Sequence, residues 1–179
     1  RKGTMMIAGD KYSYFWRDKG GFDYLKFIYD KDYNVSATEQ LEGPCGSNNV
    51  KHLYGDAADH QAEMGIADGR MASALATHIL RLSDVYLIHA EAMTLLGRGT
   101  EQSALDAFNA VHQRAIPTAA AVTSLNFDMI WKERRLEFAG EGDRWYDYVR
   151  RAYYDVNSCI AELKAQHRNR LWNCDPLYK

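Results

Sequence analysis

The sequence has no marked excess of charge of either sign. Its 179 residues include 22 Lys and Arg against 24 Asp and Glu, which gives a formal net charge of −2. Electrostatic binding to nucleic acid requires a clustered basic surface, so this balance gives no support for a nucleic-acid partner. A chain of this length is long enough to form one domain with its own apolar core.

Cysteine is also scarce. The three cysteines, Cys45, Cys159 and Cys174, are odd in number and show no C-x-x-C spacing, so neither a disulfide framework nor a zinc knuckle is indicated. If the protein is exported, one disulfide and one free thiol are compatible with this number. The six histidines show no metal-ligand spacing, and neither H-E-x-x-H nor E-x-x-H occurs. No metal site is therefore predicted.

Long apolar runs and catalytic motifs are absent as well. No apolar run approaches the ~18 residues of a membrane span, and the first residues, RKGTMMIAGDKYSYF, lack the apolar core of a signal peptide. The opening reads as the interior of a longer chain. The sequence has no G-x-S-x-G, no Walker A motif and no G-x-G-x-x-G, so no enzyme class and no cofactor is indicated.

The first half of the chain, residues 1–76, is rich in Gly, Asp, Asn and Tyr. The stretches YSYFW and FDYLKFIYDKDYNV favour one or two short strands. The stretches GPCGSNN and GDAADHQAEMGIADG favour loops, because Gly and Asn readily adopt turn conformations. We predict an irregular, loop-rich segment that depends on the rest of the protein for its stability.

From Thr77 onward the pattern becomes helical. The stretch THILRLSDVYLIHAEAMTLLGRG is apolar on nearly every side, which is typical of a helix buried between neighbours. Gly97 is a candidate for its end. His89 falls on the apolar stripe of this helix, so we predict a core histidine rather than a ligand.

The next stretch, TEQSALDAFNAVHQRAIP, predicts a second helix that begins after Thr100 and ends at Pro117. The two helices together resemble a tetratricopeptide-type pair. Three further helices are expected, over residues 127–140, 143–153 and 155–168. The predicted fold is all-α, a tetratricopeptide-like α-α superhelix (residues 77–179) with an irregular, loop-rich N-terminal half.

The stretch EFAGEGDRWYDYVRR, residues 137–151, crowds charges around aromatic rings. At about 100° per residue, Arg134, Glu137 and Glu141 share one helical face with apolar residues. Charges in such a setting are tolerated only when they are paired. We therefore predict an ion-pair clasp between helices. The expected pairs are Arg134 with Glu137, Glu141 with Arg144, and Asp147 with Arg150 and Arg151; Trp145, Val149 and Ala152 are expected to face the core.

Two other interpretations of these charges are weaker. Glu133, Glu137 and Glu141 follow one another at helical spacing, as the carboxylates of an active site would. Each has an arginine nearby, however, which would hold it ionised rather than poised near neutral pH. A di-iron or zinc site is disfavoured because the helical metal motifs are absent.

Three stretches resemble the SusD/RagB family: ILRLSDVYLIHAEAM, ALDAFNAVHQRA and IWKERRLEFAGEGDRWYDYVR. They occur in the order of the family's motifs and cover about residues 79–150. Two departures are the histidine at position 112, where the family usually has arginine, and a chain end without the family's Asn-Pro-rich tail. The charged residues assigned to the clasp, within these motifs, are Arg81, Asp84, Glu91, Arg134, Glu137, Glu141, Arg144, Asp147 and Arg150.

This resemblance implies a non-enzymatic, surface-exposed lipoprotein of the bacterial outer membrane, of which this chain is a C-terminal portion. Such a protein binds oligo- or polysaccharides, or another nutrient, and partners a SusC-like TonB-dependent transporter. The lipid anchor would lie outside this chain. The alternative function is a tetratricopeptide-like protein–protein adaptor without a small ligand.

A sugar ligand needs flat aromatic faces with polar groups beside them. The aromatic residues of the first half fit this chemistry because they alternate with Asp, Arg and Asn. Exposed Tyr and Trp also suit protein interfaces, so the same residues are candidates for contact with a transporter. The candidate ligand residues are Tyr12, Tyr14, Trp16, Tyr24, Tyr29 and Tyr33, to which Tyr54 and His52 add.

Overall fold

The structure is a computed structural model that describes residues 1–33, 47–51 and 78–166. The chain divides into two compact units, residues 1–77 and 78–179, and each is described by itself. Tyr54 and His52 lie outside the described residues. Within the described residues, no helix has both the length and the apolar character needed to cross a bilayer.

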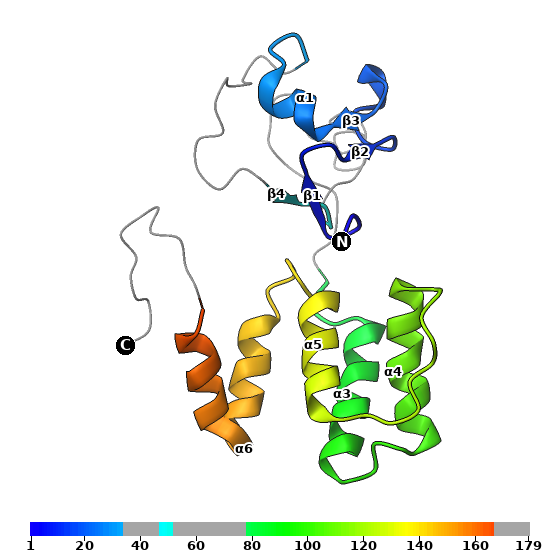
Figure 1. The fold of residues 1–179 in the computed structure, drawn as a ribbon, viewed down its shortest axis with the longest axis vertical. Helices are drawn as coiled ribbons and strands as arrows, with labels where there is room; N and C mark the ends of the chain where they lie inside the picture. Colours follow the sequence, from blue (N-terminus) through cyan, green and yellow to red (C-terminus); the bar gives the residue numbers. More distant parts are fainter. Residues whose placement is uncertain (34–46, 52–77, 167–179) are drawn as a thin grey trace. The chain divides into compact units, whose positions relative to one another are not determined.

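Two short antiparallel ribbons organise the first unit (Figure 1). In one, β1 pairs with β4 so that Met6 lies opposite Asn48. In the other, β2 pairs with β3 so that Tyr12 lies opposite Phe22. A single 3₁₀ turn, η1, connects β2 to β3. The bounds are β1 Met5–Ile7, β2 Lys11–Tyr12, η1 Arg17–Lys19, β3 Phe22–Asp23 and β4 Ser47–Asn49.

A short helix, α1 (Tyr24–Tyr29), follows β3 directly. The carboxylate of Asp23 accepts hydrogen bonds from the backbone N–H groups of Leu25 and Lys26, at 3.1 and 3.2 Å. This side chain is an N-cap, which satisfies donors that the first helical turn leaves without partners. The stretch FDYLKFIYDKDYNV thus contains one short strand, β3, as expected, and a helix follows it.

The first unit has a small core of its own, to which both ribbons and α1 contribute. Its aromatic members make it a cluster of edge-to-face and tilted rings, such as Trp16 against Phe22 at 5.3 Å between centroids. Two of the tyrosines predicted to contact ligand belong to this core. Its buried residues are Met6, Tyr12, Phe22, Tyr24 and Val50.

In the described residues 78–166, the second unit consists of four helices. The first of them begins five residues after the predicted start at Thr77, and Ile79 before it is 94% exposed. No strand occurs between residues 79 and 115, a range that the structure describes without a gap. The predicted class, helical with a loop-rich first half, is confirmed. The bounds are α3 Leu82–Leu95, α4 Gln102–Ala115, α5 Phe127–Glu137 and α6 Arg144–Lys164.

Gly97 ends α3 as predicted, and its backbone geometry shows why. Its φ is 74°, in the left-handed region that glycine adopts without strain. Arg98 donates its backbone N–H to the carbonyl of Met93, and Gly97 donates to that of Thr94. These two bonds form a Schellman motif. The next helix begins after Glu101 rather than after Thr100.

Helices α3, α4 and α5 pack around one apolar cluster, as they lie side by side in Figure 1. His89 is exposed, so the prediction of a core histidine is wrong. The buried members of the cluster are Leu87, Ala90, Met93, Ala104, Leu105, Phe108, Val111, Leu125, Ile130 and Phe138.

Helix α6 bends sharply at Asp155, where φ is −148° and ψ is 64°. Its two limbs therefore run side by side as a hairpin (Figure 1), and they match the two helices expected over residues 143–153 and 155–168. Trp131 of α5 packs with Tyr148 and Cys159 from the two limbs. Cys159 is buried and free.

Candidate ligand-binding site

The charges of the second unit form a network that connects α3, α5 and α6. At its centre is Arg134, which is 2% exposed. Its guanidinium donates to the carboxylate of Asp147, with Nε 2.8 Å from Oδ1. Nη1 lies 2.7 Å from Oδ1 of Asp84. These two atoms form an ion pair but not a hydrogen bond. One buried cation thus joins a carboxylate of α3 to one of α6.

A second arginine, Arg81, lies at the start of α3 and reaches the end of α5. Its Nε donates to Glu141 at 2.8 Å, and Nη1 donates to Glu137 at 2.5 Å. Nη2 donates to the backbone carbonyl of Glu137 at 2.9 Å. The guanidinium also lies 4.5 Å from the ring centre of Phe138, so charge and aromatic contact fix it together.

The third part of the network holds α6. Arg150 donates to Glu91 of α3 at 2.8 Å and to Asp147 at 3.2 Å. Arg144 lies 3.5 Å from the ring centre of Trp131 and donates to Glu162 at 3.1 Å. Through these contacts the first limb of α6 is connected to α3, α5 and the second limb.

All nine residues assigned to the clasp take part in this network, but several partners differ from those predicted. Among the described residues, Arg134 pairs with Asp84 and Asp147, not with Glu137. Arg144 pairs with Glu162 and Asp147, not with Glu141. The reason is geometric, because a helical projection gives the face on which a charge lies but not which helix crosses that face.

The charges of the network pair with one another across helices. Its carboxylates lie against guanidinium groups, and among the described residues no group of three His, Cys, Asp or Glu could hold a metal ion. One carboxyl departs from this pattern. Burial raises the pKa of Asp143, and the charges of Asp84, Glu141 and Asp147 raise it further.

Sequence reasoning missed two partners of this network. Glu162 accepts from the Trp131 indole at 2.9 Å and from the Tyr148 hydroxyl at 2.7 Å. Nδ1 of His112 lies 2.9 Å from Oε2 of Glu133, so this position contacts a carboxylate although it is not arginine. The signal for Glu162 was weak, since a single Glu in an amphipathic helix looks like a solvated surface residue.

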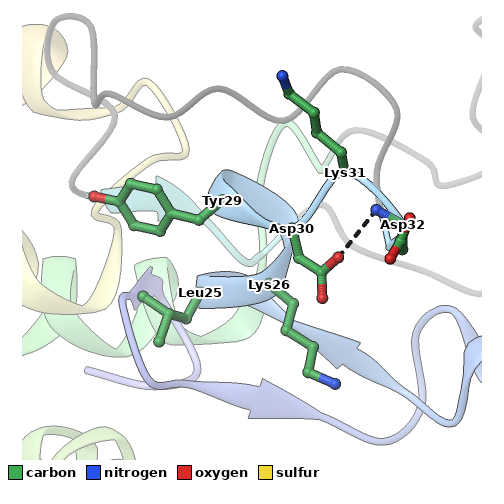
Figure 2. A pocket seen from close by; sticks show the side chains of 6 residues that line it. All are labelled: Leu25, Lys26, Tyr29, Asp30, Lys31 and Asp32. Carbon is green, nitrogen blue, oxygen red and sulfur yellow. Dashed lines mark hydrogen bonds between the residues drawn. The ribbon is translucent and has the colours of Figure 1, made fainter.

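The first unit has a shallow depression beside α1, with a volume of about 500 Å³. Figure 2 shows its side chains directed outward from α1 and the turn that follows, with Lys26 and Lys31 on opposite sides. The depression is open, so it suits contact with one face of a ligand and not its enclosure. Its lining residues are Leu25, Lys26, Tyr29, Asp30, Lys31 and Asp32.

Local hydrogen bonds fix the shape of this depression. The carboxylate of Asp30 accepts from the backbone N–H groups of Asp32 and Tyr33, at 3.0 and 3.1 Å, and so ends α1 in a tight turn. The hydroxyl of Tyr33 donates to the carbonyl of Gly21 at 2.7 Å, and the ammonium of Lys19 donates to the carbonyl of Tyr33. The turn that presents Lys31 is therefore held at both ends.

The structure divides the candidate aromatic residues into two groups. Tyr14 and Tyr29 are 51% and 41% exposed, so their ring faces are accessible. Tyr12 and Tyr24 are 4% and 3% exposed and contribute to the core, which removes them from the candidate surface.

Trp16 and Tyr33 are half-buried and contact each other, at 5.3 Å between ring centres. Trp16 also lies against Phe22 and Phe27, and the ammonium of Lys19 lies 4.6 Å from its ring centre. Its backbone has a φ of 52°, which is unusual for a large side chain. Trp16 therefore packs against the core of the first unit.

The chain is similar to known proteins of one family. The model of the SusD family matches residues 11–170. A SusD-like protein of Bacteroides ovatus is 34% identical over 152 residues, which is 83% of this chain and 23% of that protein. A SusD-like protein of Formosa agariphila is 37% identical over 83 residues, 40% of this chain and 16% of that protein.

Solved structures give the same result. A crystal structure with a xylogluco-oligosaccharide has a TM-score of 0.68 at 31% identity, and the match covers 93% of this chain and 29% of that one. A SusD-like protein of Bacteroides fragilis shares the fold, with a TM-score of 0.57 at 24% identity over 86% of this chain and 27% of that one. This chain thus spans about a quarter, or less, of the relatives that it matches.

Proposed function

Because the chain belongs to the SusD family, we propose that it is part of a non-enzymatic glycan-binding component of a nutrient-uptake system. The observation that supports this most directly is the similar crystal structure with a xylogluco-oligosaccharide. In this proposal the whole protein is lipid-anchored at the outer-membrane surface and passes its saccharide to a SusC-like TonB-dependent transporter. The anchor and most of the protein lie outside this chain.

Within the chain we assign the two units different roles. We assign the second unit the role of a scaffold, since the charges of its described residues pair with one another across helices. The first unit carries the ligand surface. The exposed rings of Tyr29 and Tyr14 can stack on the C–H faces of a sugar. Beside Tyr29, the ammonium groups of Lys26 and Lys31 can donate to hydroxyl oxygens.

An adaptor function without a small ligand is the second candidate, and the exposed apolar residues on the second unit favour it. Val85 of α3 and Tyr146 of α6, for example, are 47% and 70% exposed. Such a surface suits protein contacts better than sugar contacts because it offers few hydrogen-bonding groups. The two functions differ in which unit carries the binding surface.

Affinity electrophoresis in gels that contain xyloglucan or other polysaccharides tests the assignment. We expect a glycan to retard the protein and Tyr29→Ala to reduce that retardation. Tyr146→Ala, which removes an exposed tyrosine from the other unit, is the matched control and should migrate like the parent. Equal retardation of parent and Tyr29→Ala would remove α1 from the ligand surface. A parent that no glycan retards would favour the adaptor.

A further inference from the structure

Helix α1, which carries Tyr29 of the proposed ligand surface, is too short to be stable by itself. It has six residues, which is about 9 Å at 1.5 Å per residue. An isolated helix of this length is unstable in water, because its first turn fixes several residues for a single hydrogen bond. The conformation of α1 therefore depends on contacts that the residues around it supply.

One residue outside the helix contacts both of its ends. The backbone N–H of Tyr33 donates to the carboxylate of Asp30, the residue that ends α1, at 3.1 Å. The hydroxyl of Tyr33 accepts from the backbone N–H of Asp23 at 3.0 Å. The carboxylate of Asp23 is in turn the N-cap of α1. Tyr33 therefore connects the start of α1 to its end, with its side chain at one and its backbone at the other.

Tyr33 is also attached to the core of the first unit. Its hydroxyl donates to the carbonyl of Gly21 at 2.7 Å, and its ring lies 5.3 Å from that of Trp16 between centres. The ammonium of Lys19 donates to the carbonyl of Tyr33 at 2.7 Å. The same ammonium lies 4.6 Å from the ring centre of Trp16 and 5.4 Å from that of Tyr33. One cation thus holds both rings and the turn after α1.

These contacts distinguish Tyr33 from the tyrosines that can stack on a sugar. Its hydroxyl already makes two hydrogen bonds, and its ring contacts Trp16 and Lys19. Stacking on a sugar requires an accessible ring face, which Tyr29 has at 41% exposure. Tyr33 is therefore better suited to hold the ligand surface in place than to contact the ligand.

We propose that Tyr33, together with Lys19, is a positioning residue that fixes Tyr29 and Lys31 relative to each other. This inference rests on the proposed function. Tyr29 is the last residue of α1, and Lys31 lies in the turn that the bond from Tyr33 to Asp30 closes. A saccharide that contacts the ring of Tyr29 and the ammonium of Lys31 at once binds more tightly when both are already in place, because less conformational freedom is lost.

Two substitutions remove the positioning contacts without removing a group that faces the ligand. Tyr33→Phe deletes only the hydroxyl, and with it the bonds to Asp23 and Gly21. Lys19→Met deletes the ammonium but keeps an unbranched side chain, whereas Lys19→Arg keeps a cation that can donate. Tyr153→Phe is the matched control, since it removes the hydroxyl of a tyrosine that is 88% exposed in the other unit.

Affinity electrophoresis in gels that contain xyloglucan, or the polysaccharide that retards the parent most, gives the dissociation constant. We expect Tyr33→Phe and Lys19→Met each to raise this constant by roughly threefold to tenfold, the size of effect that the loss of one hydrogen bond produces. Lys19→Arg should restore it to within about twofold of the parent. Tyr153→Phe should leave it unchanged.

A double-mutant cycle with Tyr29→Ala separates positioning from a general loss of stability. In that background Tyr33→Phe should raise the dissociation constant by a smaller factor, because the ring that it positions is absent. An equal factor with and without Tyr29 would overturn the proposal, as would unchanged binding by Tyr33→Phe. Should Tyr33→Phe not fold, Lys19→Met decides, and binding equal to that of the parent would overturn the proposal. A parent that no polysaccharide retards would overturn the proposed function itself, and the inference with it.

Discussion

The guanidinium of Arg134 and the carboxylate of Asp147 form a buried ion pair, with Nη2 2.7 Å from Oδ1 and side-chain exposures of 2% and 1%. The pair joins α5 to α6 across 13 residues of sequence. Both charges have been removed from water, which is costly unless each keeps a partner of opposite sign. The pair therefore makes the packing of α6 depend on a charge in α5.

We predict that Arg134→Ala destabilises the protein by on the order of 3–5 kcal/mol, because it leaves Asp147 buried without its main partner. Urea denaturation followed by circular dichroism measures the change. Arg114→Ala is the matched control, since Arg114 also pairs with a buried carboxylate, that of Glu137, but its own side chain is 61% exposed.

For the control we expect a loss below about 1 kcal/mol. If Arg134→Ala and Arg114→Ala reduced the free energy of unfolding by similar amounts, burial of an ion pair would not determine its contribution to stability. A midpoint for Arg134→Ala within the error of the parent would show that the network is accessible to water.

The sequence allowed the charges to be predicted as paired, but not their partners. Arg134 was correctly placed among apolar residues by its helical angle. That angle carries no information on which helix packs against α5, so Asp84 and Asp147, the actual partners, could not be selected. Long-range pairs depend on the crossing of helices, which many residues determine together.

The burial of Trp145 was also not predictable from helical periodicity alone. Trp145 was expected on the core face of α6, but it is 53% exposed and lines an apolar groove between the two limbs of this helix. The core tryptophan is Trp131, which is 8% exposed. The apolar stripe of α6 is real, but the described helices cover only part of it.

We therefore predict that Trp131→Ala costs about 3–5 kcal/mol of stability, as for other buried aromatic residues. It also removes the acceptor ring for Arg144 and the donor to Glu162. Trp145→Ala should cost clearly less. Thermal melts of both variants check the order, and a larger loss for Trp145→Ala would show that the groove is covered by a stabilising contact.

A third prediction concerns Asp143, whose pKa is raised by burial and by the neighbouring carboxylates of Asp84, Glu141 and Asp147. A raised carboxyl pKa means that the charged form is disfavoured in the folded protein. Stability due to protonated Asp143 is therefore present below the pKa of the unfolded chain and is lost as the pH rises through the raised pKa of the folded protein.

We expect Asp143→Asn to stabilise the protein at pH 7 by less than about 1 kcal/mol. Asn is chosen because it is as good an N-cap residue as Asp, and Asp143 occupies the N-cap position of α6. The gain should disappear near pH 3. Asp128→Asn, in the first turn of α5, is the control and should destabilise slightly through the helix dipole. A loss of stability for Asp143→Asn at pH 7 would contradict a repulsion between Asp143 and the neighbouring carboxylates of Asp84, Glu141 and Asp147.

In the first unit, composition predicted irregularity correctly but not which aromatic residues are exposed. Tyr12 and Tyr29 are similar in sequence context, each beside a Lys or Asp. Only the structure separates them, because Tyr12 lies on a strand whose partner places it opposite Phe22. Asp23 carried a readable signal for α1, as an N-cap residue before YLKFIY, but the aromatic content favoured a strand.

The last prediction concerns acid stability and Glu162. Burial acts to raise its pKa, but hydrogen bonds from Tyr148 and Trp131 and the charge of Arg144 act in the opposite direction, and the net result is a lowered pKa. The unfolded chain, in which the pKa returns to about 4.5, binds more protons than the folded protein below that pH. Stability due to Glu162 is therefore present above pH 4.5 and is lost as the pH falls through the lowered pKa.

Glu162→Gln removes this dependence. We expect the variant to be less stable than the parent at pH 7, and we expect the difference to shrink as the pH falls toward 3. Glu101→Gln is the control because Glu101 also has a lowered pKa, through hydrogen bonds from Arg98, but its pair lies at the surface, where such contacts contribute little. Melting temperatures of the three proteins between pH 7 and pH 3 measure the effect. Parallel curves for the parent and Glu162→Gln would mean that Glu162 does not hold the two limbs of α6 together through its charge.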